Sequence, residues 1–125
     1  MVSYFFDTSA LIEIVKENPH FEPYKRNVGI ILTRLNLMEL YYFYLRERNP
    51  LEGKKAYTKL LNFTAPYSND TIQRAVEFRF QHKNKKFSYV DCIGYMIAKE
   101  RSIKFLTSDS GFKGMDNVEF VEQLK

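Results

Sequence analysis

The sequence predicts an α/β fold with three layers (α/β/α), in which helices cover both faces of a central, mainly parallel sheet. Short apolar runs, such as Val2–Phe6 and the stretch VGIILT at 28–33, indicate strands, and the longer segments between them space their apolar residues as helices do. Strands that alternate with helices of roughly 10 to 15 residues are typical of right-handed βαβ units, which build parallel sheets. Because 125 residues is a usual length for one hydrophobic core, we expect a single domain over 1–125.

The elements of the first half follow from apolar spacing and from two Asn-Pro pairs. We expect a strand over 2–6, a helix from 9 to about 17, a strand over 28–33 and a helix from 36 to 48. The helix from 36 carries apolar residues at i, i+3, i+4, i+7 and i+8, starting from Leu37. The Asn-Pro pairs at 18–19 and 49–50 end the two helices, since the residue before a proline disfavours helical geometry.

The second half repeats the alternation of helices and strands. The expected elements are a helix over 51–63, a short strand over 64–68, helices over 69–86 and 87–102, and strands over 103–109 and 117–121. No repeat, low-complexity tract or linker interrupts them. The whole chain therefore reads as one α/β unit.

Charge and cysteine content restrict the class of protein. The net charge of +4 and pI of about 9.1 favour anionic partners only mildly. Cys92 is the only cysteine, which excludes an internal disulfide, and His20 and His82 lie too far apart in sequence to suggest a structural zinc site. No signal peptide and no membrane span is expected from the apolar runs, so we expect a cytoplasmic protein.

Four acidic residues stand where the carboxyl ends of the strands are expected. Asp7 directly follows the first strand, and Asp109 stands just past the run IKFLT. Glu39 is expected in the first turn of the helix after the second strand, and Asp91 in the first turn of the helix before IKFLT. Ligands of open parallel sheets bind outside the carboxyl ends of the strands, so we expect these four carboxylates to meet there. Asp116 reads as part of a plain turn and is left out of this set.

Each acid also has a purely structural interpretation. Carboxylates are common at helix N-caps, in capping boxes and in turns. On that interpretation Asp7 caps the helix from Ser9, Asn36 with Glu39 and Ser88 with Asp91 form capping boxes, and Asp109-Ser110-Gly111 is an ordinary turn.

Taken together, the four acids favour a metal site. Two carboxylates at about 4 Å repel by about 4 kcal/mol at an effective dielectric constant of about 20, and a divalent cation removes that cost. Mg²⁺ and Mn²⁺ prefer hard oxygen ligands, and they can activate water and neutralise a phosphate. A bound cation would also explain why Asp7 has no lysine or arginine near it in sequence.

The same residues carry a resemblance to a known family. YFFDTSALIE at the start, Glu39 in LNLMELYY, the segment FSYVDCIGYMIAKERSIKFLTSD and the following GF resemble PIN-domain nucleases, in particular VapC-type toxins of VapBC toxin–antitoxin pairs. The resemblance runs nearly end to end, although residues 45–87 match only as helices. After the third acid, Cys92, Gly94 and Tyr95 stand where related toxins usually have small residues.

The resemblance implies a PIN-like fold and a Mg²⁺- or Mn²⁺-dependent endoribonuclease. Its catalytic and metal-binding acids would be Asp7, Glu39, Asp91 and Asp109, and Thr8 and Thr107 would hydrogen-bond the acids or a metal-bound water. The implied partners are an RNA substrate, a cognate antitoxin that lays a peptide across a groove near the acids, and a second copy of the chain in a homodimer.

Other interpretations stay open. A PIN-like RNA-binding or protein-interaction module without catalysis fits the same residues, and a receiver-like or dehalogenase-like phosphoryl-transfer domain also places an Asp after its first strand. The basic residues of the second half, Arg79, Lys83, Lys85, Lys86, Lys99, Arg101 and Lys104, indicate either a solvated helix face or a track for phosphates.

Overall fold

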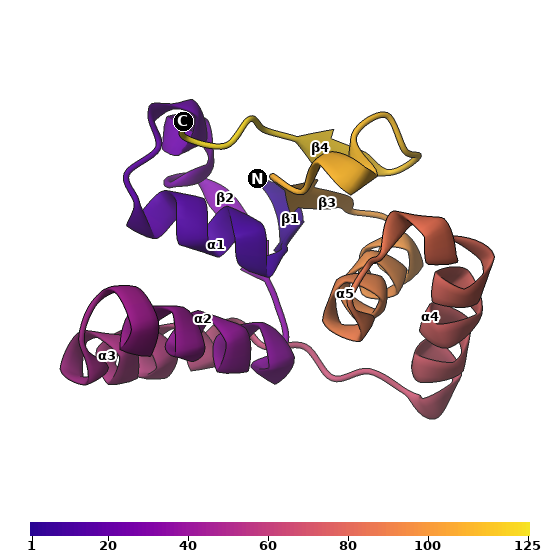
Figure 1. The fold of residues 1–125 in the computed structure, drawn as a ribbon, viewed down its shortest axis with the longest axis horizontal. Coiled ribbons are helices and arrows are strands. Elements are labelled where there is room, and N and C mark those ends of the chain that lie inside the picture. The colour runs from indigo at the N-terminus through magenta and orange to yellow at the C-terminus, as the bar shows by residue number, and fades with distance from the viewer.

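A computed structural model describes all 125 residues and contains one four-stranded parallel sheet (Figure 1). The strands are β1 Val2–Phe6, β2 Val28–Ile31, β3 Lys104–Thr107 and β4 Val118–Phe120, in the order β2-β1-β3-β4. All three pairings are parallel, with Val2 opposite Val28, Tyr4 opposite Lys104 and Phe105 opposite Val118 among the register pairs. The predicted α/β fold with a parallel sheet is confirmed.

Helices and short 3₁₀ turns connect the strands. The helices are α1 Thr8–Val15, α2 Arg34–Glu47, α3 Pro50–Leu60, α4 Asn69–Gln81 and α5 Tyr89–Glu100, and the 3₁₀ turns are Pro19–Tyr24, Leu61–Phe63, Lys83–Lys85 and Ser110–Phe112. Figure 1 shows α2 and α3 as one helical pair and α4 and α5 as a second pair. No helix combines the length and apolar character that crossing a lipid bilayer requires.

The two faces of the sheet are buried against different helices, which makes the three layers. Alternate side chains of a strand point to opposite faces. Phe5 and Phe105 pack with α4 and α5, whereas Phe6 and Leu106 pack with α1 and α2. Parallel strands covered on both faces are apolar at successive positions, which explains the run of Tyr4, Phe5 and Phe6 before Asp7.

Gly94 lets α5 lie close to the sheet. A Cβ built on this residue would lie 2.5 Å from Cε1 of Phe5, a distance that real contacts do not allow. Cys92 and Tyr95, on the same helix, are buried in the same core, and the Tyr95 hydroxyl donates a hydrogen bond of 2.6 Å to the carbonyl of Asp116. The three residues that depart from the pattern of related toxins are thus accommodated by close helix–sheet packing.

Several element boundaries differ from the sequence prediction. The helix expected over 69–86 ends at Gln81, and the strand expected over 64–68 is reduced to one isolated bridge between Thr64 and Leu32. The helix of Glu39 begins earlier than expected, at Arg34, because Thr33 rather than Asn36 caps it. Glu39 consequently lies in the second turn of α2, and the expected Asn36–Glu39 capping box is wrong.

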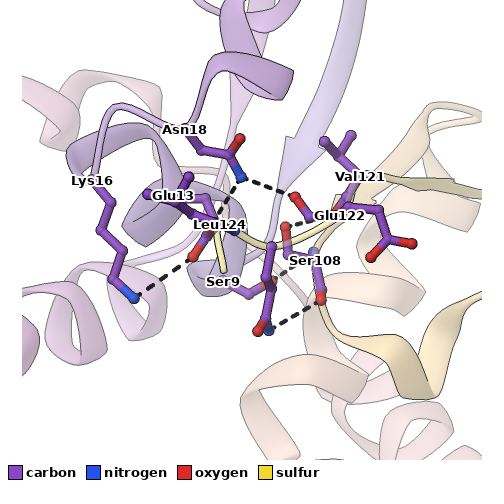
Figure 2. A network of polar contacts seen from close by, with 9 residues as sticks. Ser9, Glu13, Lys16, Asn18, Ser108, Val121, Glu122 and Leu124 are labelled. Carbon is purple, nitrogen blue, oxygen red and sulfur yellow. Dashed lines mark hydrogen bonds and ion pairs between the residues drawn. The ribbon is translucent and has the colours of Figure 1, made fainter.

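The segment after β4 is tied to α1 and to the end of β3 (Figure 2). Glu13, which is 4% exposed, accepts hydrogen bonds from Asn18 Nδ2 at 2.8 Å and from the amide of Leu124 at 2.7 Å. The Ser108 hydroxyl donates to the carbonyl of Val121 at 2.7 Å. These bonds hold the last residues against the strand end from which the candidate site is built.

Candidate active site

The candidate site lies at the carboxyl ends of β1 and β3, where the strand order reverses. The chain goes from β1 outward to β2 and returns on the other side of β1 as β3. Connections diverge at such a point and leave a crevice, which is where ligands of open α/β sheets bind. Asp7 directly follows β1, and Thr107 and Asp109 lie at the end of β3, so the fold places these three residues at the crevice.

Asp7 is buried among hydrogen-bond donors. Its side chain is 1% exposed and accepts from the Thr8 amide at 2.9 Å, the Ser9 hydroxyl at 2.9 Å and the Thr107 hydroxyl at 2.8 Å. The bond from the Thr8 amide is the N-cap of α1, as the structural interpretation of the sequence predicted. The cap therefore accounts for one oxygen of Asp7, and the two hydroxyls hold the other.

Glu39 is oriented by a series of hydrogen bonds that begins at the start of α2. The Thr33 hydroxyl donates to Oδ1 of Asn36 at 2.8 Å, and Nδ2 of Asn36 donates to the Thr8 hydroxyl at 3.0 Å. With its oxygen occupied as an acceptor, Thr8 donates its own proton to Oε1 of Glu39 at 2.6 Å. Thr8 thus joins Asp7, through its amide, to Glu39, through its hydroxyl.

Asp91 and Asp109 are held by local backbone amides. Asp91 accepts from the Ser88 amide at 2.9 Å, while the Ser88 hydroxyl accepts from the Asp91 amide at 3.0 Å, so the predicted capping box at the start of α5 is confirmed. Asp109 Oδ1 accepts from the Gly111 amide at 2.9 Å, and the Asp109 amide donates to the Thr107 hydroxyl at 3.0 Å. These local contacts use only one carboxylate oxygen of each side chain.

The electrostatics connect all four acids through Asp91. Burial, and then the charge of Asp91, raise the pKa of Asp7 to about 8, against its three hydrogen bonds. Burial also raises the pKa of Glu39, with a smaller contribution from Asp91. Burial raises the pKa of Asp91 against its hydrogen bonds with Ser88, and the charge of Asp109 adds to the rise. Asp91 therefore interacts electrostatically with each of the other three acids.

These carboxylates have no basic partner. None of the ion pairs of the structure includes Asp7, Glu39, Asp91 or Asp109. Binding of a cation would lower the raised pKa values of Asp7, Glu39 and Asp91, because its charge stabilises the ionised carboxylates.

The donor set fits a hydrated hard cation rather than a closed metal cage. No group of three or more His, Cys, Asp or Glu side chains is arranged so that it could hold a metal ion by itself. Mg²⁺ commonly keeps several waters and is held by one or two carboxylates together with phosphate oxygens. Asp7 and Asp91, whose charges interact, are the two carboxylates that could hold an ion in that way.

A groove beside Glu39 runs between α1 and α2. It has a volume of about 550 Å³. Its lining residues are Thr8, Ser9, Ile12, Met38, Glu39, Tyr42, Phe43 and Arg46. Apolar side chains form much of the wall, while Glu39 and Arg46 contribute opposite charges.

Sequence reasoning missed Ser9 and Asn36 as parts of the site. Ser9 follows Asp7 closely enough that its hydroxyl could have been included, and it also accepts from the Ser108 amide at 3.0 Å. Asn36 reaches Thr8 over 28 positions, a contact that no local pattern encodes. Asp116, which the sequence reasoning excluded, is 86% exposed and pairs with Lys99 at 3.7 Å. Because it precedes β4, it lies at the amino ends of the parallel strands, opposite the crevice.

Fold and site together define an α/β protein with an acidic cluster at the switch point of a parallel sheet. A profile of the PIN domain matches residues 4–118, and the chain belongs to the PIN domain family. No curated protein sequence matches the chain.

Solved structures share this fold at low sequence identity. A toxin–antitoxin complex from Klebsiella pneumoniae has a TM-score of 0.73 at 18% identity and covers 97% of this chain and 99% of its own. Mycobacterium tuberculosis VapC20, described as a toxin that cleaves the sarcin-ricin loop, has a TM-score of 0.75 at 17% identity, covering 93% and 97%. DNA-bound VapBC from Salmonella typhimurium has a TM-score of 0.72 at 17% identity, covering 98% of each chain.

Proposed function

We propose that this chain is a divalent-metal-dependent endoribonuclease, the toxin of a VapBC-type toxin–antitoxin pair, with Asp7, Glu39, Asp91 and Asp109 as its catalytic, metal-binding acids. The observation that carries the proposal is the coupling of these acids through Asp91, in a crevice that holds no basic partner. Membership of the PIN domain family and the fold shared with VapBC toxins support it.

The side chains would prepare the site for Mg²⁺ or Mn²⁺. When bound, the cation supplies positive charge to the scissile phosphate and lowers the pKa of a coordinated water. Ser9 and Thr107 hold one oxygen of Asp7 in place, and Thr8 holds Glu39. Because hydrogen bonds fix these carboxylates beforehand, little side-chain entropy is lost when they bind an ion.

The direct test is cleavage of RNA by the pure protein. We expect cleavage with Mg²⁺ or Mn²⁺, none in EDTA, and none by an Asp91→Asn variant that still folds. Asp116→Asn is the matched control, since this exposed Asp lies away from the crevice. Cleavage that persists in EDTA or in the Asp91→Asn variant would refute the metal mechanism.

The groove between α1 and α2 supports an antitoxin as partner. Its apolar wall suits the apolar side chains of a peptide, and Glu39 at one side suits a basic one. Met38 lines the groove and is 54% exposed, so Met38→Glu should leave folding intact while weakening the complex. Co-expression with a short reading frame adjacent to the gene tests this proposal: the wild-type chain should co-purify with the product, and the variant should not.

An apolar stripe on α4 supports a homodimer. Ile72, Val76 and Phe80 recur every four residues, so they share one face of the helix, and all three are exposed. A second copy of the chain that covered this stripe would remove it from water. Sedimentation should give a dimer for the wild type and a monomer for Val76→Glu, and an unchanged dimer would locate the interface elsewhere.

One observation favours the second candidate, a PIN-like binding module without catalysis. The acids are linked in pairs, and no three of them are arranged to hold an ion. Calorimetric titration with Mn²⁺ separates the candidates, because a nuclease must bind the ion and the module need not. Absence of binding would favour the module.

A further inference from the structure

Five residues from the last turn of α4 to the first turn of α5 make up what we call the basic strip: Arg79, Lys83, Lys85, Lys86 and Tyr89. We propose that the basic strip binds single-stranded RNA and that Tyr89 stacks on a base next to the cleaved phosphate. This inference rests on the proposed endoribonuclease function and assigns the path of its substrate. The sequence alone left open whether these charges form a solvated face or a track for phosphates.

The charges of the basic strip are uncompensated. Its three lysines are exposed, and neither they nor Arg79 takes part in any ion pair. Lys86 has a φ of 59° and ends the 3₁₀ turn in the left-handed conformation, so α4 and α5 are not one continuous helix. Uncompensated positive charge is available to phosphates, whose neutralisation supplies most of the non-specific affinity for nucleic acid.

Lys85 connects the strip to Asp109. Its Nζ donates to the carbonyl of Gly111 at 3.0 Å, and the amide of Gly111 donates to Oδ1 of Asp109 at 2.9 Å. A single residue therefore separates this ammonium group from one of the four acids. Exposed lysines on α3 are also unpaired, but no comparable contact links them to the site. The basic strip therefore differs from the lysines of α3 in its position next to the acids, and not in charge.

Arg79 connects the strip to Asp91 in the same way. Its Nε donates to the carbonyl of Phe87 at 2.7 Å, and the amide of the next residue, Ser88, donates to Oδ2 of Asp91 at 2.9 Å. Positive groups thus stand beside two of the acids without neutralising them. A phosphate bound by the basic strip would therefore lie close to the carboxylates.

Tyr89 supplies the surface for a base. Its side chain is 56% exposed, and the Arg79 guanidinium lies 4.3 Å from the ring centroid on one face. This cation–π contact fixes the ring, whose remaining exposed surface is available for stacking. Proteins that bind single-stranded RNA combine a basic track with such aromatic platforms. Tyr89 is the first residue of α5 and Asp91 lies in the same turn, so the ring and the acid are at the same end of the helix.

The first experiment compares two charge-matched variants. Fluorescence anisotropy with a labelled single-stranded RNA of about 16 nucleotides is measured in EDTA in the Asp91→Asn background, so that binding is observed without cleavage. Lys83→Gln/Lys86→Gln removes two charges from the strip, and Lys54→Gln/Lys55→Gln removes two from α3. At low salt, we expect the Kd of the strip variant for the RNA to be about tenfold higher than that of its parent. The slope of log K against the logarithm of salt concentration should be smaller by about 1.4. The Kd of the α3 variant should stay within about twofold of its parent. Equal effects of the two variants, or no effect of the strip variant, would overturn the proposal.

The second experiment tests stacking. Tyr89→Leu should weaken RNA binding at least about fivefold, the lower range for loss of one base–aromatic stack, and Tyr89→Trp should retain it. Equal binding by the Leu and Trp variants would remove Tyr89 from the proposal. The two experiments can fail separately. If RNA binding depends on the basic strip but no metal-dependent cleavage occurs, only the nuclease function is rejected. If cleavage occurs but RNA binding does not depend on the strip, only this inference is rejected.

Discussion

The Thr107 hydroxyl donates a hydrogen bond of 2.8 Å to Oδ2 of Asp7, although 100 positions separate the two residues. The bond joins the ends of the adjacent strands β1 and β3 at the switch point of the sheet. The same hydroxyl accepts from the amide of Asp109 at 3.0 Å. Thr107 therefore places two of the four acids relative to each other.

Replacing Thr107 by Val should destabilise the protein. The change keeps the volume but removes a donor from buried Asp7 and an acceptor from the Asp109 amide. We expect the free energy of unfolding to fall by about 1–3 kcal/mol in urea titrations, and Thr107→Ser to restore most of it. A Val variant as stable as the wild type would show that the hydroxyl does not organise the site.

Without metal, the stability of the protein should fall as pH rises from about 4 to about 8. Burial raises the pKa of Asp7 from its usual 3.8 to about 8, so between these values the folded chain holds a proton that the unfolded chain has released. The contribution of that proton to the free energy of unfolding is complete at pH values below the pKa in the unfolded chain. It is lost progressively as the pH rises to the pKa in the folded chain, and the free energy of unfolding falls by up to about 1.4 kcal/mol per pH unit. Unfolding titrations in EDTA across this range measure the effect. Asp7→Asn should make the fall smaller and leave the part that comes from Glu39 and Asp91, whose pKa values are also raised.

Divalent cations should restore the stability lost at high pH. A ligand that binds only the folded state at about 100 times its Kd adds about 2.7 kcal/mol. At pH 8 we expect Mn²⁺ to raise the melting temperature of the wild type and of the Asp116→Asn control, but not that of Asp7→Asn. An equal rise in all three proteins would mean that the cation binds elsewhere.

Asp91→Asn should separate stability from activity. Its amide oxygen can still accept from the Ser88 amide, and the backbone amide of residue 91 still donates to the Ser88 hydroxyl, so both bonds of the capping box are kept while the repulsion with Asp7, Glu39 and Asp109 disappears. In EDTA at pH 8 we expect the variant to be more stable by on the order of 1 kcal/mol. RNA cleavage should fall below detection, a loss of at least about 100-fold. A less stable variant would contradict the assignment of Asp91 as the centre of repulsion.

Glu13 should anchor the segment after β4 (Figure 2). Glu13→Ala leaves Asn18 Nδ2 and the Leu124 amide without this acceptor, and we expect a loss of about 1–3 kcal/mol in unfolding experiments. Glu13→Gln keeps an acceptor oxygen and should lose less. Hydrogen exchange at the Leu124 amide gives a local readout, which should be faster in the Ala variant than in the wild type.

Local patterns in the sequence determined the fold class and most of the elements. β1 was predicted with its observed bounds, and the capping box of Ser88 and Asp91 was recognised from spacing alone. These features depend on residues within one or two turns of each other, so periodicity and capping preferences are sufficient to predict them. The predicted start of α2 was wrong although its signal is also local. Thr33, the residue that caps the helix, lay just outside the expected helix.

Only the tertiary structure decided which groups surround each acid. The sequence placed Asp7 at a strand end, but its burial, its bond to Thr107 and its electrostatic coupling to Asp91 arise from strands and helices that meet across the sheet. The bond from Asn36 to Thr8, which aligns Glu39, has the same origin. Hydrogen-bond geometry and desolvation depend on packing among distant segments, whereas sequence patterns report only the preferences of neighbouring residues.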